Sequence, residues 1–161
     1  MLRMLKILLI LSVALWALVG GALNFLHWGE TREAVAAVTN MVTFEGGAES
    51  WKATANPGLI LAGALFISLS KLTAGFFCVI GALKMWAARG GDVAVFAQSK
   101  HVALAGCAVA VFMLFSGFIV IAESWFELWR SDVMRGPVLA SAYRYAGMIA
   151  LIAIFVASKE D

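Results

Sequence analysis

The chain has 161 residues, of which 63% are hydrophobic and 14% are charged, with a formal net charge of +2 and a mean hydropathy of +0.93. Soluble domains are roughly 45–50% apolar and about 25% charged, so this composition is typical of a protein that lies in a lipid bilayer. It excludes disordered chains and disulfide-stapled secreted modules, and the small charge without a basic run excludes nucleic-acid binding. Cys78 and Cys107 lie inside apolar runs, where we expect packing residues rather than a disulfide.

Four segments are long and apolar enough to cross a bilayer as helices. A spanning helix needs about 20 mostly apolar residues, because the hydrocarbon core is about 30 Å thick and each residue rises about 1.5 Å. Open strands cannot lie in lipid, so the sequence predicts an all-α membrane protein, a four-transmembrane-helix bundle forming one domain over residues 1–161. The spans are expected at about Leu5–Leu26, Gly58–Trp86, Val102–Ala122 and Val138–Ala157.

The first span also has features of a signal peptide. Arg3 and Lys6 precede its apolar run, and the small residues Gly20 and Gly21 follow that run. The apolar run is longer than the usual signal core of about 7–15 residues. We therefore expect an uncleaved spanning helix.

The loop between the first two spans, residues 27–57, is long for a simple connector. Within residues 30–44 the apolar side chains recur at helical spacing; they are Ala34, Val35, Val38, Met41 and Val42. This pattern predicts a short amphipathic helix on the outer membrane interface. The alternative is a surface on which a partner docks.

The positions of lysine and arginine predict the orientation. Six fall on the side of the termini and four on the other side; the six are Arg3, Lys6, Lys84, Arg89, Lys100 and Lys159, and the four are Arg32, Lys52, Arg130 and Arg135. Because cytoplasmic loops carry the excess of positive charge, we expect both termini in the cytoplasm of a bacterium and the chain in its inner membrane.

Lys71 lies near the middle of the second span, in the segment Ser68–Thr73. A cation at that depth costs at least ~2.5–3.5 kcal/mol, so its side chain should face protein, water or a partner. Lys71 is therefore the best candidate for a functional site. The alternative is a structural lysine whose stem reaches toward the surface or whose ammonium bonds to hydroxyl and carbonyl groups in the bundle.

Arg144 is a second cation within a span, about two turns into the fourth. The third span ends on the same outer side at Glu123, so an ion pair between Arg144 and Glu123 is expected to hold two helices together. The alternative is a lipid phosphate bound to Arg144.

No motif for catalysis is present. His27 and His101 are the only histidines and fall at opposite ends of spans, whereas bis-histidine haem ligation needs two imidazoles at one depth. Metalloprotease, serine hydrolase and nucleotide-binding signatures are absent. We therefore predict no catalytic residue, no metal and no cofactor, and we expect a protein that is not an enzyme.

Small residues recur at four-residue spacing on two spans, at Ala142, Ala146 and Ala150 and at Ala17 and Gly21, and they favour close helix contact. Together with the two intramembrane cations they predict a non-catalytic accessory subunit of a larger respiratory or photosynthetic membrane complex. The alternative is a small oligomeric transporter or channel in which Lys71 attracts an anion. A third possibility, a quinone- or lipid-binding enzyme subunit, requires a polar residue beside an open apolar cleft.

The segment Glu123–Ser131, with the sequence ESWFELWRS, is followed by Gly136 and then by Ala142-Tyr143-Arg144. This arrangement resembles the family of predicted small integral membrane proteins known as domain of unknown function 2165. That family has four spans, a comparable length and a Trp-Phe-x-x-Trp segment before its last helix. The resemblance implies an inner-membrane location and no particular reaction.

Overall fold

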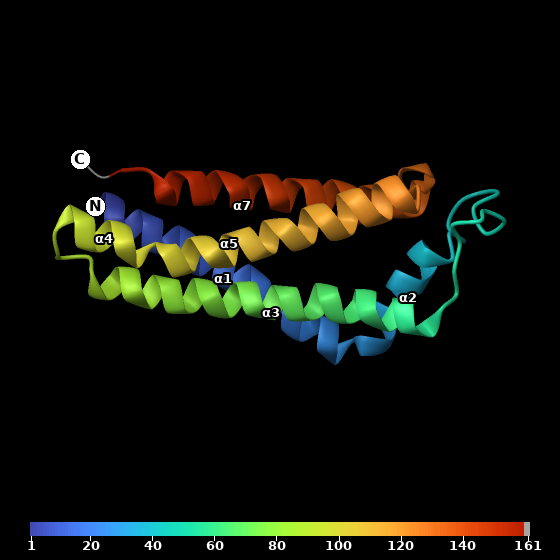
Figure 1. The fold of residues 1–161 in the computed structure, drawn as a ribbon, viewed down its shortest axis with the longest axis horizontal. Helices are drawn as coiled ribbons and strands as arrows, with labels where there is room; N and C mark the ends of the chain where they lie inside the picture. Colours follow the sequence, from blue (N-terminus) through green and yellow to red (C-terminus); the bar gives the residue numbers. More distant parts are fainter. Residues whose placement is uncertain (160–161) are drawn as a thin grey trace.

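The computed structural model describes residues 1–159, and in that range it is built from helices without a β-strand. Four helices are long and apolar enough to cross a membrane, which confirms the predicted fold class; they cover Leu2–Leu26, Pro57–Ala87, Val93–Trp125 and Asp132–Ala157. The N-terminus, α4 and the end of α7 lie at one end of the elongated bundle, and α2 lies toward the other (Figure 1). We call these the terminal end and the loop end.

The long helices are divided into shorter elements. In chain order these are α1 (Leu2–Leu26), α2 (Trp28–Thr39), α3 (Pro57–Ala87), α4 (Val93–Ser99), α5 (His101–Phe112), η1 (Met113–Trp125), η2 (Leu128–Arg130), α6 (Asp132–Met134), η3 (Arg135–Ala140) and α7 (Ser141–Ala157). η1 and η3 are π-helices, and η2 is a single 3₁₀ turn. The third long helix is thus α4, α5 and η1 end to end, and the fourth is α6, η3 and α7.

The third long helix begins earlier than the sequence predicted, at Val93 instead of Val102. The segment expected to be a linker is itself helical and forms α4. Lys100 stands at the junction of α4 and α5 and is only 3% exposed, so this junction belongs to the packed bundle.

The fourth long helix also begins earlier, at Asp132 instead of Val138. Its start is capped by Ser131, whose Oγ accepts a hydrogen bond from the backbone N–H of Met134 at 3.1 Å. Pro137, the residue just before the expected start, lies inside the helix within the π-helical turn of η3.

α3 and α5 touch through their backbones in the terminal half of the bundle. A Cβ at Gly81 would lie 2.3 Å from the backbone nitrogen of Ala103, and one at Gly106 would lie 2.7 Å from Sγ of Cys78. Distances this short leave room only for hydrogen, so two glycines define the helix contact. Cys78 and Cys107 are free thiols buried in the same core.

Two buried lysines close the terminal end. Lys6 is 0% exposed and its Nζ donates to the carbonyl oxygen of Ser158 at 2.7 Å, while Lys100 Nζ donates to that same oxygen at 3.0 Å. Both cations thus lie at the C-terminus of α7, where the helix dipole is negative. In the sequence analysis, these two lysines serve only to predict the orientation in the membrane.

We expect Gly81→Ala to lower the free energy of unfolding by about 1–3 kcal/mol, because its methyl group would overlap the backbone of α5. Gly147→Ala is the matched control, since a Cβ at Gly147 in α7 would meet no atom within 4 Å. There the better helix propensity of alanine should raise stability by about 0.5–1 kcal/mol. Thermal unfolding in detergent, followed by circular dichroism, measures both; equal effects of the two variants would contradict the glycine contact.

Candidate functional site

A cavity of about 870 Å³ occupies the loop half of the bundle. α3 and the third long helix diverge toward the loop end, and α2 lies across the opening between them (Figure 1). Residues of α1, α2, α3, η1 and η3 line the space. Ligand sites in proteins are commonly about 300–1,000 Å³, so this cavity is large enough for a small molecule or a single lipid chain.

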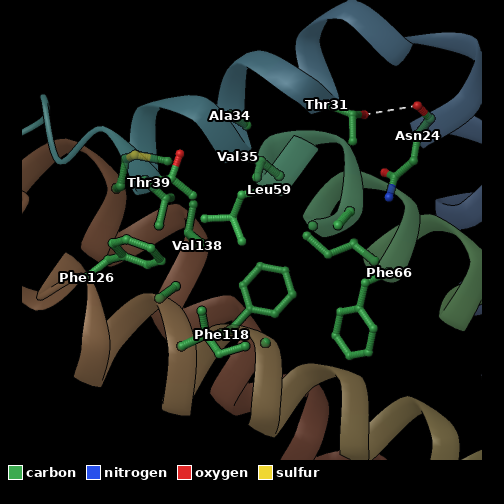
Figure 2. A pocket seen from close by; sticks show the side chains of 18 of the residues that line it. Asn24, Thr31, Ala34, Val35, Thr39, Leu59, Phe66, Phe118, Phe126 and Val138 are labelled. Carbon is green, nitrogen blue, oxygen red and sulfur yellow. Dashed lines mark hydrogen bonds between the residues drawn. The ribbon is translucent and has the colours of Figure 1, made fainter. Parts of the chain in front are cut away.

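The walls of the cavity are mostly apolar. The phenyl rings of Phe66 from α3 and Phe118 from η1 project into it, and Phe126 lies at one side (Figure 2). Val35 of α2 and Val138 of η3 also line it. Such walls favour an aliphatic or aromatic ligand over water.

Both π-helices border this cavity. η1 contributes lining residues between Gly117 and Trp125, and η3 contributes Val138. A π-helix bonds residue i to i+5; it is rare, and single π-helical turns are frequent at functional sites. Here the wider turn occurs where the third and fourth helices leave the packed bundle to form the cavity wall.

α2 is the predicted amphipathic helix, but it ends at Thr39 rather than Phe44. The chain turns at Met41, whose φ of 53° is left-handed and cannot continue an α-helix. The apolar side of α2 faces the cavity through Val35, Val38 and Thr39. A Cβ at Gly63 of α3 would lie 3.0 Å from Cγ1 of Val35, so this glycine permits α2 to lie close to α3.

Lys71 lines the cavity from α3, on the side facing α1. Its side chain is half-buried, and its Nζ lies 3.5 Å from the point where a Cβ at Gly20 would be. Within residues 1–159 this ammonium group has no hydrogen-bond or ion-pair partner. None of the α3 residues that line the cavity lies nearer the terminal end than Lys71, so it marks the deep end of the cavity.

Asn24 is a second polar group in the wall, and sequence reasoning missed it. It lies four residues after Gly20 on α1, and therefore one turn along the same face of that helix. The ammonium of Lys71 reaches this face from α3, next to Gly20. Its backbone carbonyl accepts a hydrogen bond from Oγ1 of Thr31 at 3.0 Å (Figure 2). Its side-chain amide lines the cavity and has no partner among the described residues. An amide inside an apolar span was the available signal.

Two polar side chains lie in contact at the entrance. Nδ1 of His27 and Oε1 of Glu30 are 3.4 Å apart, both side chains are exposed, and both residues line the cavity. The polarity of the site therefore runs from this pair at the loop end, past the Asn24 amide, to a single cation at the deep end.

The structure does not bring Arg144 and Glu123 together. Glu123 lies two residues before the loop end of η1, whereas Arg144 lies 12 residues after Asp132 and 13 before Ala157, near the middle of its long helix. The guanidinium of Arg144 donates to Oγ of Ser141 at 3.0 Å, and within residues 1–159 it forms no ion pair. Its side chain is exposed on the outside of the bundle, next to Tyr143, which is 73% exposed.

The small-residue series of the fourth span faces the bundle. Ala142 is buried, and Ala146 and Ala150 are half-buried. Ala17 and Gly21 of α1 are also buried, and a Cβ at Gly21 would lie 2.7 Å from Cδ2 of Leu72. Both series therefore serve contacts within this chain.

An ion cluster joins the loop after α2 to the segment after η1. Oε1 of Glu127 is 2.7 Å from Nζ of Lys52, and its Oε2 is 3.1 Å from Nη1 of Arg130. The guanidinium of Arg130 also donates to the backbone carbonyl of Glu45 at 3.2 Å. The hydrogen bond from Lys52, followed by that from Arg130, holds the pKa of Glu127 below its ordinary value near 4.5. The cluster closes the loop end beyond the cavity.

These features define the class of protein: a small, all-helical, four-span integral membrane protein with an apolar cavity whose wall contains one lysine. The chain matches the family described as predicted small integral membrane protein (DUF2165) over residues 2–159. It belongs to that family, which confirms the resemblance drawn from the sequence. Neither the curated proteins nor the solved structures contain a significant match.

Acidification should loosen the loop end through Glu127. The pKa of the Glu127 carboxyl is lower in the folded state than its ordinary value near 4.5, so at a pH above 4.5 the ionised carboxylate stabilises the fold. This stabilisation is lost as the pH falls from 4.5 through the lower pKa of the folded state. We expect Glu127→Gln to lower the unfolding temperature at pH 6 and to weaken its dependence on pH below about 4.5. The control is Glu49→Gln, an exposed residue of the loop after α2 at the same end of the bundle. Identical pH profiles for both variants would contradict the role of the cluster.

Proposed function

We propose that this protein is a non-catalytic accessory subunit of a larger membrane complex, respiratory or photosynthetic, in the inner membrane of a bacterium. The observation that carries the proposal is the position of Arg144. This residue lies about 18 Å along its helix from Asp132, at 1.5 Å per residue, and its side chain is exposed where the isolated chain would meet lipid.

An arginine at that depth has to be compensated. Its transfer to the bilayer centre costs at least ~2.5–3.5 kcal/mol, and intramembrane cations accordingly face protein or a water-filled cavity. The hydroxyl of Ser141 supplies one neutral acceptor and no counter-charge. A carboxylate or carbonyl group of a neighbouring subunit would supply the rest.

The helix face around Arg144 suits such a neighbour. Ala140 and Gly147 are exposed four residues before and three residues after it, and therefore lie on the same face. Small residues let a partner helix approach closely. Leu151, 61% exposed, extends this face toward the terminal end.

Transport through the chain has less support. The cavity ends at Lys71, and beyond it α3 and α5 touch through Gly81 and Gly106. A solute passing from the cavity to the terminal end would have to separate helices that are in backbone contact.

Arg144→Leu tests the proposed contact. Because Arg144 has no ion pair within residues 1–159, we expect the unfolding temperature of the isolated variant to change little. A stoichiometric membrane partner, recovered with the wild type in mild detergent and counted by native mass spectrometry, should be lost. The control is Arg135→Leu, which removes an exposed arginine near the start of the same long helix.

Recovery of the wild type alone, or only as a dimer of itself, would contradict the accessory role. Retention of the partner by Arg144→Leu would show that Arg144 does not make the contact.

The orientation is also part of the proposal, with the terminal end in the cytoplasm. It is supported by the six lysines and arginines on that side against four on the other. Glu49→Cys and Gly90→Cys place an exposed thiol at the loop end and the terminal end respectively, and both native cysteines are buried. In spheroplasts, a membrane-impermeant maleimide should label the first variant at once and the second only after lysis. The reverse pattern would invert the orientation.

A further inference from the structure

We propose that the cavity binds one single-chain amphiphile with an anionic carboxylate, a long-chain fatty acid, through Lys71 and Asn24. The inference concerns a different surface from the proposed subunit contact, since Arg144 does not line the cavity.

The first step is the unbalanced charge. Lys71 faces an apolar space without a hydrogen-bond or ion-pair partner in residues 1–159, although such a cation is costly unless paired. The two buried lysines at the terminal end differ from it, because Lys6 and Lys100 donate to a backbone carbonyl. A negatively charged ligand atom would supply the counter-charge and the hydrogen-bond acceptor that the described residues do not offer to Lys71.

The second step is the neighbouring amide. Asn24 lies one helical turn from Gly20, against which the Lys71 ammonium rests, and its side chain lines the same cavity. An ammonium and an amide N–H₂ on one wall can donate to the two oxygens of a carboxylate. The bond from the ammonium is charge-assisted and therefore the stronger one.

The third step is the size of the head group. Lys71 lies 14 residues after Pro57, about 21 Å along α3 from the loop end at 1.5 Å per residue. A phospholipid would have to bring a large hydrated head group to that depth. A carboxylate group has only three heavy atoms, so it needs much less space at that depth.

The fourth step is the shape and lining of the space. Its volume of about 870 Å³ and its walls of Phe66, Phe118, Val35 and Val138 suit an aliphatic chain (Figure 2). The chain would lie among these side chains, between the head at Lys71 and the entrance beside α2.

The experiment measures binding of palmitate to the purified full-length protein in nonionic detergent by native mass spectrometry. We expect one palmitate per chain, and at least about tenfold weaker binding of methyl palmitate, which keeps the tail and lacks the charge. This comparison needs no variant. Equal affinity for acid and ester would overturn the proposal.

Variants then locate the site. Lys71→Met, which keeps an unbranched apolar stem, should weaken palmitate binding at least about tenfold, and Asn24→Leu should weaken it by a smaller factor. The control is Lys84→Met, an exposed lysine of the same helix outside this cavity. Undiminished binding by Lys71→Met, with an unfolding temperature like that of the wild type, would overturn the assignment.

Two further probes distinguish other ligand classes. Stronger binding of a single-chain lysophosphatidate than of palmitate would assign the site to a phosphate head group and overturn the carboxylate. Saturable binding of decylubiquinone without saturable binding of palmitate would assign it to a neutral quinone. Loss of the membrane partner in Arg144→Leu with palmitate binding intact would leave this proposal standing, so the two proposals fail separately.

Discussion

Backbone contact between α3 and α5 determines where this bundle can be open. Gly81 and Gly106 remove the side chains that would hold the two helices apart in the terminal half, and Ala103 and Cys78 fill the remaining space. Two helices that touch at one end and carry bulky residues between them at the other end must diverge. Phe66 and Phe118 are those bulky residues, and α2 covers the opening they leave. The cavity is thus a consequence of close packing elsewhere.

Four basic side chains of the long helices meet three different environments. Lys6 and Lys100 are almost fully buried, and the carbonyl at the end of α7 receives both of them. Lys71 faces an apolar cavity, and Arg144 lies on the outside of the bundle near the middle of its helix. Position along a span therefore does not decide the role of a cation. The helix face decides it, because the face sets which groups can reach the charge.

Hydropathy was sufficient to predict the four spans, since each is an apolar run longer than the bilayer needs. The helix starts were harder to place. Val93 begins a helix of only seven residues, too short to show a period, and Pro137 lies inside a helix, within the π-helical turn of η3. Neither feature has a periodic signal. The amphipathic pattern after residue 30 correctly indicated α2, but the left-handed turn at Met41 ended it early.

The candidate site was predictable only in part. Lys71 was conspicuous as a charge in an apolar run, whereas its apolar surroundings depend on how far two helices diverge, which no local pattern encodes. Asn24 could have been noticed as an amide in the first span. The expected pair of Arg144 with Glu123 failed because the fourth helix starts at Asp132 rather than at Val138, which places the arginine deeper than the glutamate. An error of six residues in a helix start is about 9 Å of depth.

The position of the cavity has a consequence for the lipid that can reach it. All of it lies in the half of the bundle remote from the N-terminus, under α2 and beside the loop-end halves of α3 and η1. A fatty acid bound there, as proposed above, would come from one leaflet. The two leaflets of a membrane differ in composition, so binding of the proposed ligand would follow the composition of one leaflet and not that of the other.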